Sequence, residues 1–187
     1  MESSPRSSEN QERPAGASTV RPWREVFAEA RVTTLVSTWF GAGFLPIAPG
    51  TWGSLCAIPI AHVIVLFWGV WGLVGFALAV AVVGTHASHE TARLRGVKDP
   101  GEIVVDEVAG QAIALIPVYA LVPGDAVFLR IASILVAFLL FRILDVWKPG
   151  PIGWLERLPG GFGIMADDLL GGAVAAAMIA AGLLLKG

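Results

Sequence analysis

Long apolar runs separated by short polar segments dominate the chain, and this alternation predicts helices of membrane-spanning length. The apolar runs cover residues 51–68, 71–83, 108–122, 126–147 and 169–185. A membrane-spanning helix needs about 20 residues, with a range of about 17–25. The last two runs reach this length, and the first three do so only with some polar residues at their ends. We therefore predict an all-α fold, a polytopic membrane helical bundle of about five to six helices.

Two further segments precede the first apolar run. Residues 23–39 place Trp23, Val26 and Phe27 on one face of a helix, which predicts an amphipathic helix in the membrane interface. Residues 1–22 are rich in Ser, Glu and Pro and have almost no large apolar side chains, so we expect a disordered tail. The tail also lacks the apolar core of a signal peptide. These features predict a tail at residues 1–22 and one helical membrane domain at residues 23–187.

The composition supports a membrane protein. Hydrophobic residues make up 55% of the chain and charged residues only 15%, whereas ordinary soluble domains are about 25% charged. A soluble bundle of unusually apolar helices is the alternative. The formal net charge of -2 provides no basic field for nucleic acid, and the single Cys56 lies in an apolar run, where it is expected to be a packing residue.

The distribution of Lys and Arg predicts the orientation in the membrane. These residues gather in the N-terminal segment and in the polar segments 84–107 and 148–168, whereas the connections near Gly69 and Pro123 contain none. The positive-inside rule then assigns the N-terminus and both polar segments to the cytoplasm. Arg130 weakens this asymmetry slightly because it lies near the other face. Five spans with these connections would bring every acidic motif to the cytoplasmic face of a bacterial inner membrane.

The first polar segment with candidate chemistry covers residues 99–111. It contains four acids within nine positions: Asp99, Glu102, Asp106 and Glu107. Adjacent carboxylates repel each other unless a cation or a proton lies between them, and carboxylate oxygens are preferred ligands of Mg²⁺. Capping of a helix N-terminus is the alternative, but it would account for one acid only. We predict these four acids as magnesium ligands.

A second candidate segment covers residues 141–149. Arg142, Asp145 and Lys148 are spaced by three, so they are expected to share one face of a helix that ends before Pro149. A guanidinium and an ammonium group held beside an acid form a phosphate clamp. An intrahelical Arg–Asp salt bridge at the membrane interface, with Lys148 extending towards water, is the alternative.

The third candidate segment is glycine-rich and ends in two acids, Asp167 and Asp168. Backbone N–H groups near Gly161, at the start of a helix, can point at an anion, and the two acids could hold a metal ion that bridges it. A glycine-rich turn followed by an acidic cap is common, so this pattern gains weight only by meeting the other two segments.

Three single residues add weaker candidates. Thr51 and Ser54 follow a Pro-Gly pair, where their hydroxyl groups serve as helix caps or as phosphate ligands. His89 follows a helical run and is either an interfacial histidine or a proton donor and phosphate contact. No zinc site is expected, because no Cys or third His accompanies His86 and His89.

Taken together, these segments resemble the phosphatidylglycerophosphatase A family. The matching stretches are PGTWGSL at 49–55, HETA at His89, DPGEIVVDEVAGQ at 99–111, FRILDVWKPGPI at 141–152 and GGFGIMADDLLGG at 160–172. The resemblance implies a Mg²⁺-dependent membrane enzyme that removes the terminal phosphate of phosphatidylglycerophosphate to give phosphatidylglycerol. Carried over by motif, its site comprises Asp99, Glu102, Asp106, Glu107, Arg142, Asp145, Lys148, Asp167 and Asp168, together with Thr51 and His89.

The expected mechanism is attack by a metal-activated water on the phosphate. Asp106, Glu107, Asp167 and Asp168 would hold one or two Mg²⁺. Arg142 and Lys148 would stabilise the developing charge, with Asp145 as their orienting group or as the base, and His89 would protonate the leaving alkoxide. Thr51, Ser54 and Gly161 complete the expected substrate contacts. A covalent aspartyl-phosphate is the rival route.

Other readings of the sequence remain open at this stage. The substrate could be another lipid phosphate, such as a polyprenyl phosphate or phosphatidate. An ion transporter would also use membrane acids, but it would need them at mid-span and gives no role to Arg142 and Lys148. A membrane adaptor with purely structural caps would show no Mg²⁺ dependence. Small residues at 171–177 permit close helix contacts, and they are compatible with a homo-oligomer.

Overall fold

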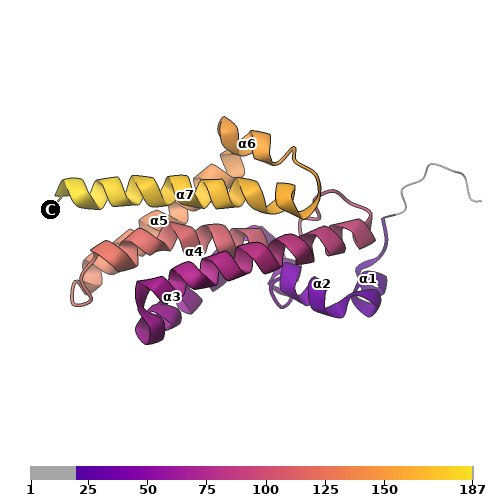
Figure 1. The fold of residues 1–187 in the computed structure, drawn as a ribbon, viewed down its shortest axis with the longest axis horizontal. Helices are drawn as coiled ribbons and strands as arrows, with labels where there is room; N and C mark the ends of the chain where they lie inside the picture. The colour runs from indigo at the N-terminus through magenta and orange to yellow at the C-terminus, as the bar shows by residue number, and fades with distance from the viewer. Residues whose placement is uncertain (1–19, 187) are drawn as a thin grey trace, which may run out of the picture.

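The computed structural model describes residues 20–186, and this part of the chain contains helices and no strands. The elements are α1 (Trp23–Glu29), α2 (Arg31–Ser37), the 3-10 helix η1 (Ala42–Phe44), α3 (Pro49–Arg95), α4 (Val105–Leu121), α5 (Val127–Trp147), α6 (Pro151–Leu155) and α7 (Gly160–Lys186). Figure 1 shows α3, α4, α5 and α7 side by side along the molecule, with α1 and α2 at one end. The predicted all-α class is confirmed. Most of the predicted tail at residues 1–22 lies outside the described residues.

The longest element, α3, is a helical hairpin. Its backbone leaves the helical region at Gly69, where φ is 66° and ψ is -170°, a conformation that glycine adopts without the steric cost of a Cβ atom. Ala61 of the first arm shares one apolar core with Leu73 and Ala77 of the second arm. These residues lie at similar sequence distances on either side of Gly69, as antiparallel arms require. The break predicted at Gly69 is therefore confirmed.

The second arm of α3 extends beyond its apolar run and includes polar residues that the sequence pattern assigned to a connecting segment. Ser88 and Thr91 are fully buried there, and Ser37 of α2 donates a hydrogen bond to the Thr91 hydroxyl over 3.0 Å. The arm ends at Gly96, whose left-handed backbone (φ 73°) is a common way to close a helix. The polar end of this arm is therefore helical and packs against α2, although its hydropathy alone would assign it to a loop.

The predicted single helix over residues 23–39 is wrong in its continuity, because α1 and α2 are separated at Ala30 (φ -134°, ψ 61°). Alanine itself favours helices, so the break comes from tertiary contacts. Trp23 at the start of α1 donates its indole N–H to Glu102 over 2.9 Å and lies beneath the Arg95 guanidinium. Ser37 near the end of α2 is bound to α3 instead. The helices α1 and α2 are therefore held in place by different contacts.

The core of the bundle is built around α4, which packs against α3, α5 and α7. Val108, Ala112, Leu115 and Val118 are all fully buried. They follow one another at intervals of three or four residues, which places them along one continuous stripe of the helix. The helix α4 is therefore the central helix of the bundle.

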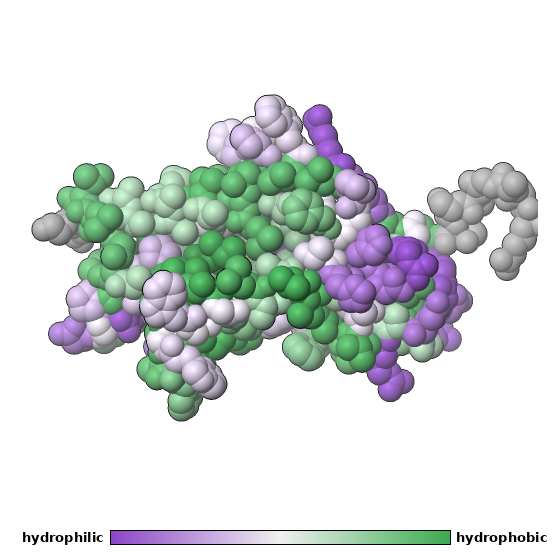
Figure 2. Space-filling view, viewed as in Figure 1, coloured by the Kyte–Doolittle hydropathy of each residue, from purple (hydrophilic) through white to green (hydrophobic). Residues whose placement is uncertain are grey.

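The exterior of the bundle is apolar. Large hydrophobic side chains such as Phe67, Trp71, Val82 and Phe128 are at least 73% exposed, and Figure 2 shows a broad hydrophobic surface along the body of the molecule. Three helices, α3, α5 and α7, are long and apolar enough to cross a membrane. A continuous apolar exterior of this kind is unfavourable in water. The fold is that of a helical membrane protein, and the soluble alternative does not fit it.

The polar segments meet at one end of the bundle. The Arg21 backbone N–H donates to the Arg95 carbonyl over 3.0 Å, next to the end of α3. Lys98 donates to the backbone carbonyl of Glu156 over 3.1 Å, and this contact joins the loop before α4 to the segment before α7. Figure 2 shows hydrophilic side chains gathered at the same end. Three distant stretches of sequence therefore share one polar surface.

Candidate active site

Three carboxylates from two helices converge where α4 begins. Asp106 and Glu107 lie in the first turn of α4, and Asp168 lies near the start of α7. One ligand oxygen from each of them lies within 4.8 Å of the others. Asp106 is 9% exposed and Asp168 is 2% exposed. We call these three residues the acid cluster.

Each residue of the acid cluster keeps a buried oxygen free for a ligand. Asp106 Oδ1, Glu107 Oε2 and Asp168 Oδ2 have no hydrogen-bond partner among the described residues. Buried polar groups without partners are rare and costly, and adjacent carboxylates also repel each other. An oxygen-only group of this kind fits a hard divalent cation such as Mg²⁺ rather than Zn²⁺, which favours nitrogen and sulfur ligands.

Close contact between α4 and α7 creates the acid cluster. A Cβ atom on Gly172 of α7 would lie 2.3 Å from the carbonyl oxygen of Gly110 in α4. A Cβ atom on Gly110 would lie 2.6 Å from the carbonyl oxygen of Asp168 and would also meet the Phe141 ring. Only glycine at these positions lets the two backbones approach so closely, and the approach brings Asp168 to the start of α4.

The start of α3 closes a further side of the acid cluster. A Cβ atom on Gly50 would lie 1.9 Å from Glu107 Oε1, so the first turn of α3 lies directly against this carboxylate. Thr51 follows in the same turn, and its backbone N–H donates to the Ala48 carbonyl over 2.9 Å. The Ser54 hydroxyl donates to the Gly50 carbonyl over 3.0 Å. The Ser54 hydroxyl therefore stabilises this turn. Thr51 directly follows Gly50, which borders the acid cluster.

Arg142 of α5 joins the acid cluster to Asp145. Its Nη1 atom pairs with Asp145 one turn later and lies 3.9 Å from Glu107 Oε1. All three side chains are at most 17% exposed. The guanidinium is thus held between two carboxylates, beside the proposed ligand oxygens.

Lys148 departs from the predicted helix face. The helix α5 ends at Trp147, because the residue before a proline avoids the α region. Lys148 itself adopts a left-handed conformation (φ 47°, ψ 55°). Its Nζ atom lies 2.6 Å from Asp167 Oδ2 and 3.6 Å from Glu156 Oε1. Arg142 and Asp145 do share a face, whereas Lys148 turns towards α7.

Two opposing effects act on the charge of Lys148. Partial burial lowers the pKa of its ammonium group, but the hydrogen bond that it donates to Asp167 and the charges of Asp167 and Glu156 raise this pKa by more. The net result is a pKa above the ordinary lysine value, so this group stays positively charged at neutral pH. A permanent cation therefore lies beside Asp167, next to the acid cluster.

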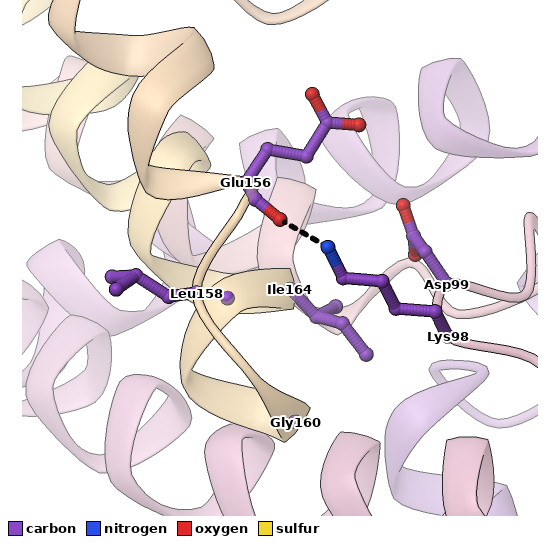
Figure 3. Close-up of a pocket in the computed structure, with 7 residues that line it drawn as sticks. Lys98, Asp99, Glu156, Leu158, Gly160 and Ile164 are labelled. Carbon is purple, nitrogen blue, oxygen red and sulfur yellow. Dashed lines mark hydrogen bonds between the residues drawn. The ribbon is translucent and has the colours of Figure 1, made fainter.

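Asp99 and Glu102 lie outside the acid cluster. Asp99 borders a cavity of about 40 Å³ next to Lys98 and Glu156, as Figure 3 shows. Burial is the main cause that raises the pKa of the Asp99 carboxyl group, and the nearby Lys148 lowers it in part. Glu102 accepts the indole hydrogen bond of Trp23. Of the four acids in this segment, only Asp106 and Glu107 belong to the group that could share one metal ion.

His89 contacts the start of α7. Its Nδ1 atom lies 3.4 Å from the Gly161 backbone nitrogen, and a Cβ atom on Gly160 would lie 2.4 Å from the same Nδ1 atom. A Cβ atom on Gly161 would lie 1.9 Å from the Thr85 carbonyl oxygen. The glycines that the sequence suggested as an anion cradle thus allow the start of α7 to pack tightly on α3.

One buried polar residue near the acid cluster was not singled out from the sequence. Gln111 is fully buried one helical turn after Glu107. Neither polar atom of its side chain has a hydrogen-bond partner within residues 20–186. The sequence did contain a signal for this residue, because a glutamine inside an apolar run is unusual. Its spacing of four residues from Glu107 predicts that both lie on the same face of α4.

Comparisons with known proteins identify the family of this chain. The family model described as Phosphatidylglycerophosphatase A matches residues 35–183, a range that contains every carboxylate of the acid cluster. The chain belongs to the phosphatidylglycerophosphatase A family. It is therefore a phosphatase of phospholipid metabolism, and the resemblance seen in the sequence motifs is confirmed.

Individual relatives cover most of the chain. Phosphatidylglycerophosphatase A of Escherichia coli (strain K12) is 40% identical over 147 residues, which cover 78% of this chain and 80% of the relative. The protein of the same name from Haemophilus influenzae is 39% identical over 137 residues, covering 73% and 79%. A Bacteroides thetaiotaomicron protein provisionally named phosphatidylinositol-3-phosphatase is 33% identical over 150 residues, covering 78% and 90%. No solved structure gives a significant match.

The glycine contact between α4 and α7 predicts the effect of a single methyl group. Gly172→Ala should force the two backbones apart and separate Asp106 from Asp168, because the new Cβ would overlap the Gly110 carbonyl. Overpacking of this kind costs about 1–3 kcal/mol. We expect a lower melting temperature and a loss of phosphatase activity of about tenfold or more.

Gly182→Ala is the matched control, because it lies in the same helix and the added Cβ would meet no described atom within 4 Å apart from the adjoining residues and backbone of its own helix. Alanine favours a helix over glycine, so this variant should be as stable as the parent protein or slightly more stable. Equal losses of activity in both variants would contradict the role of the α4–α7 contact.

Proposed function

We propose that this protein hydrolyses the terminal phosphate monoester of phosphatidylglycerophosphate to give phosphatidylglycerol and inorganic phosphate. The observation that carries the proposal is the acid cluster, with its three unpartnered oxygens, beside the guanidinium of Arg142. Two relatives named phosphatidylglycerophosphatase A support the choice of substrate. The apolar exterior supports a substrate whose acyl chains stay in the bilayer.

Mg²⁺ is the cofactor that this site fits best. Asp106, Glu107 and Asp168 would hold it, since they combine proximity, burial and unpartnered oxygens. Asp167 Oδ1 is also buried without a partner and offers a further ligand beside them. When bound, Mg²⁺ neutralises phosphate oxygens and lowers the pKa of a coordinated water.

The remaining polar groups bind and orient the phosphate. The Arg142 guanidinium carries five N–H donors in a fixed plane, which suits the charge that spreads over phosphoryl oxygens during transfer. Asp145 fixes the orientation of this plane through its ion pair. Lys148 adds a second positive charge, and its contact with Asp167 keeps it next to the same site. Asp145 can alternatively accept a proton from the attacking water.

His89 has a different role in this proposal. It contacts the backbone at the start of α7, two helical turns before Asp168. We assign it to positioning that start, and through it Asp167 and Asp168, and no proton transfer is assigned to it. Thr51 remains a candidate phosphate contact, because it follows Gly50, which borders Glu107.

The proposed orientation has the acid cluster on the cytoplasmic side of a bacterial inner membrane. The five apolar stretches, including both arms of α3 and the 17-residue α4, would cross the bilayer. The end that carries the acid cluster also carries most of the basic side chains, whereas the turn at Gly69 and the loop before α5 carry none. The phosphate would then be hydrolysed at headgroup depth.

A different lipid phosphate is the second candidate substrate. The relative provisionally named phosphatidylinositol-3-phosphatase is 33% identical to this chain. The carboxylates of the acid cluster do not by themselves distinguish a glycerol group from another alcohol. An ion transporter is less well supported, since the acid cluster lies at the ends of α4 and α7 and not at their midpoints.

The decisive experiment measures phosphate release by the purified protein. Phosphatidylglycerophosphate, phosphatidate and a soluble sugar phosphate are compared with Mg²⁺ and after treatment with a chelator. We expect the fastest release from phosphatidylglycerophosphate, no release after chelation and recovery on addition of Mg²⁺. Unchanged release after chelation would exclude the metal assignment, and faster release from phosphatidate would change the substrate.

Substitutions at the acid cluster give the matching test. Asp168→Asn keeps the shape of the side chain but removes a ligand charge, so turnover should fall at least about 100-fold at limiting Mg²⁺. Asp125→Asn, in the loop between α4 and α5, should leave turnover unchanged. Elution as a monodisperse species and an unchanged helical spectrum check that both variants fold. Near-wild-type turnover in Asp168→Asn would contradict the proposed site.

The orientation is tested by labelling single cysteines in intact bacterial cells. In a Cys56→Ala background, Asp125→Cys should react with a membrane-impermeant maleimide from outside the inner membrane. Val97→Cys lies in the loop before α4, at the same end of the bundle as the acid cluster. It should therefore react only after the membrane is opened. The reverse pattern would show that the site faces the other compartment.

A further inference from the structure

A groove of about 260 Å³ with an entirely apolar lining lies between the end of α2 and the second arm of α3. Trp39 and Phe40 form one wall, Phe76 and Val83 form the other, and Val105 contributes to the floor. No polar or charged side chain lines it within residues 20–186. Its natural occupant is therefore an apolar group.

The groove begins beside the acid cluster and leads away from it along α3. Val105, at its floor, directly precedes Asp106, and Gly84 packs against Val105 and Met165. Phe76 precedes Gly84 by eight residues, a distance of about 12 Å along a helix. The groove thus runs from the level of the acid cluster towards the middle of the apolar body.

The wall formed by Trp39 and Phe40 is held in an uncommon backbone conformation. Both residues have positive φ angles, 47° and 54°, which are unfavourable for bulky residues. This conformation brings the Trp39 ring edge-on to Phe76, with 6.2 Å between the ring centroids, while Phe40 stays 72% exposed. Strain retained in a fold is a pointer to function, and here it keeps two aromatic side chains on the rim of the groove.

We propose that this groove binds one acyl chain of the lipid phosphate substrate while the phosphate lies at the acid cluster. The inference rests on the proposed function and adds a binding site for the apolar part of the substrate. Val105 lines the groove and directly precedes Asp106 in the first turn of α4, and this proximity favours an acyl chain over a second copy of this protein. A lipid phosphate carries its charge and its chain on one molecule, as the adjacent charged and apolar sites require. Binding of the chain would align the phosphate with Arg142.

Filling the groove tests the proposal through chain-length dependence. Ala79→Phe and Val83→Phe each add bulk to the lining. Val82→Phe is the matched control, because Val82 is the neighbouring residue, is 73% exposed and does not line the groove. Each variant is assayed with phosphatidylglycerophosphate that carries either palmitoyl or hexanoyl chains.

For the palmitoyl substrate we expect KM to rise about tenfold in the two groove variants, the loss produced by about two methylene contacts, while kcat stays constant. The hexanoyl substrate should be hydrolysed equally by all variants, since its chains are too short to fill the groove. An unchanged KM for the palmitoyl substrate, or an equal loss with both substrates, would overturn the proposal.

Photolabelling separates failure of the groove from failure of the proposed function. A lipid phosphate with a diazirine in its acyl chain is added to the protein in phosphatidylcholine nanodiscs. Excess unlabelled lipid phosphate should suppress labelling at Phe40 and Val83 but not at Val82. This competition supports the groove even if no phosphate is released, in which case only the proposed function fails. Labelling of groove residues that is not suppressed would identify them as an ordinary lipid contact and overturn the groove.

Discussion

The burial of several carboxylates at the contact between α4 and α7 is the interaction on which the rest of the site depends. Asp106, Glu107 and Asp168 lie together with oxygens that no described group satisfies. Burial of an anion costs several kcal/mol unless a positive charge or hydrogen bonds compensate it. Arg142 supplies part of this compensation. In the proposed function, a divalent cation would supply the remainder.

The glycines at this contact connect the fold to the chemistry. Gly110 and Gly172 allow the backbones of α4 and α7 to approach until no side chain fits between them. Small residues at helix contacts are a common solution in membranes, where the hydrophobic effect does not drive helices together. In this protein the same contact fixes the relative positions of Asp106 and Asp168. Packing of the helices and assembly of the site are therefore one event.

The position of the site along the bundle suits a substrate that is half polar and half apolar. The acid cluster lies in the first turn of α4 and near the start of α7. Figure 2 shows hydrophilic side chains at one end of the molecule and a hydrophobic surface along its body. In the proposed function, the phosphate would lie at the polar end of the bundle while the acyl chains stay in the bilayer.

Much of this arrangement follows from the sequence alone. The apolar runs determined the helices, Gly69 determined the hairpin in α3, and the motif order determined the family. Periodicity also paired Arg142 with Asp145, because both lie within one regular helix. Local spacing is sufficient for features of this kind, since neighbours on a helix are fixed by its pitch.

Only the tertiary structure decided which acids converge. Asp106, Glu107 and Asp168 form the acid cluster, whereas Glu102 binds Trp23, although all four belong to acidic motifs. Lys148 left the expected helix face for Asp167, and the break at Ala30 followed from contacts on either side of it. Each of these outcomes depends on residues far apart in the chain. A linear pattern reports the period of a helix, but it carries no information on how closely two helices approach or which of their side chains meet.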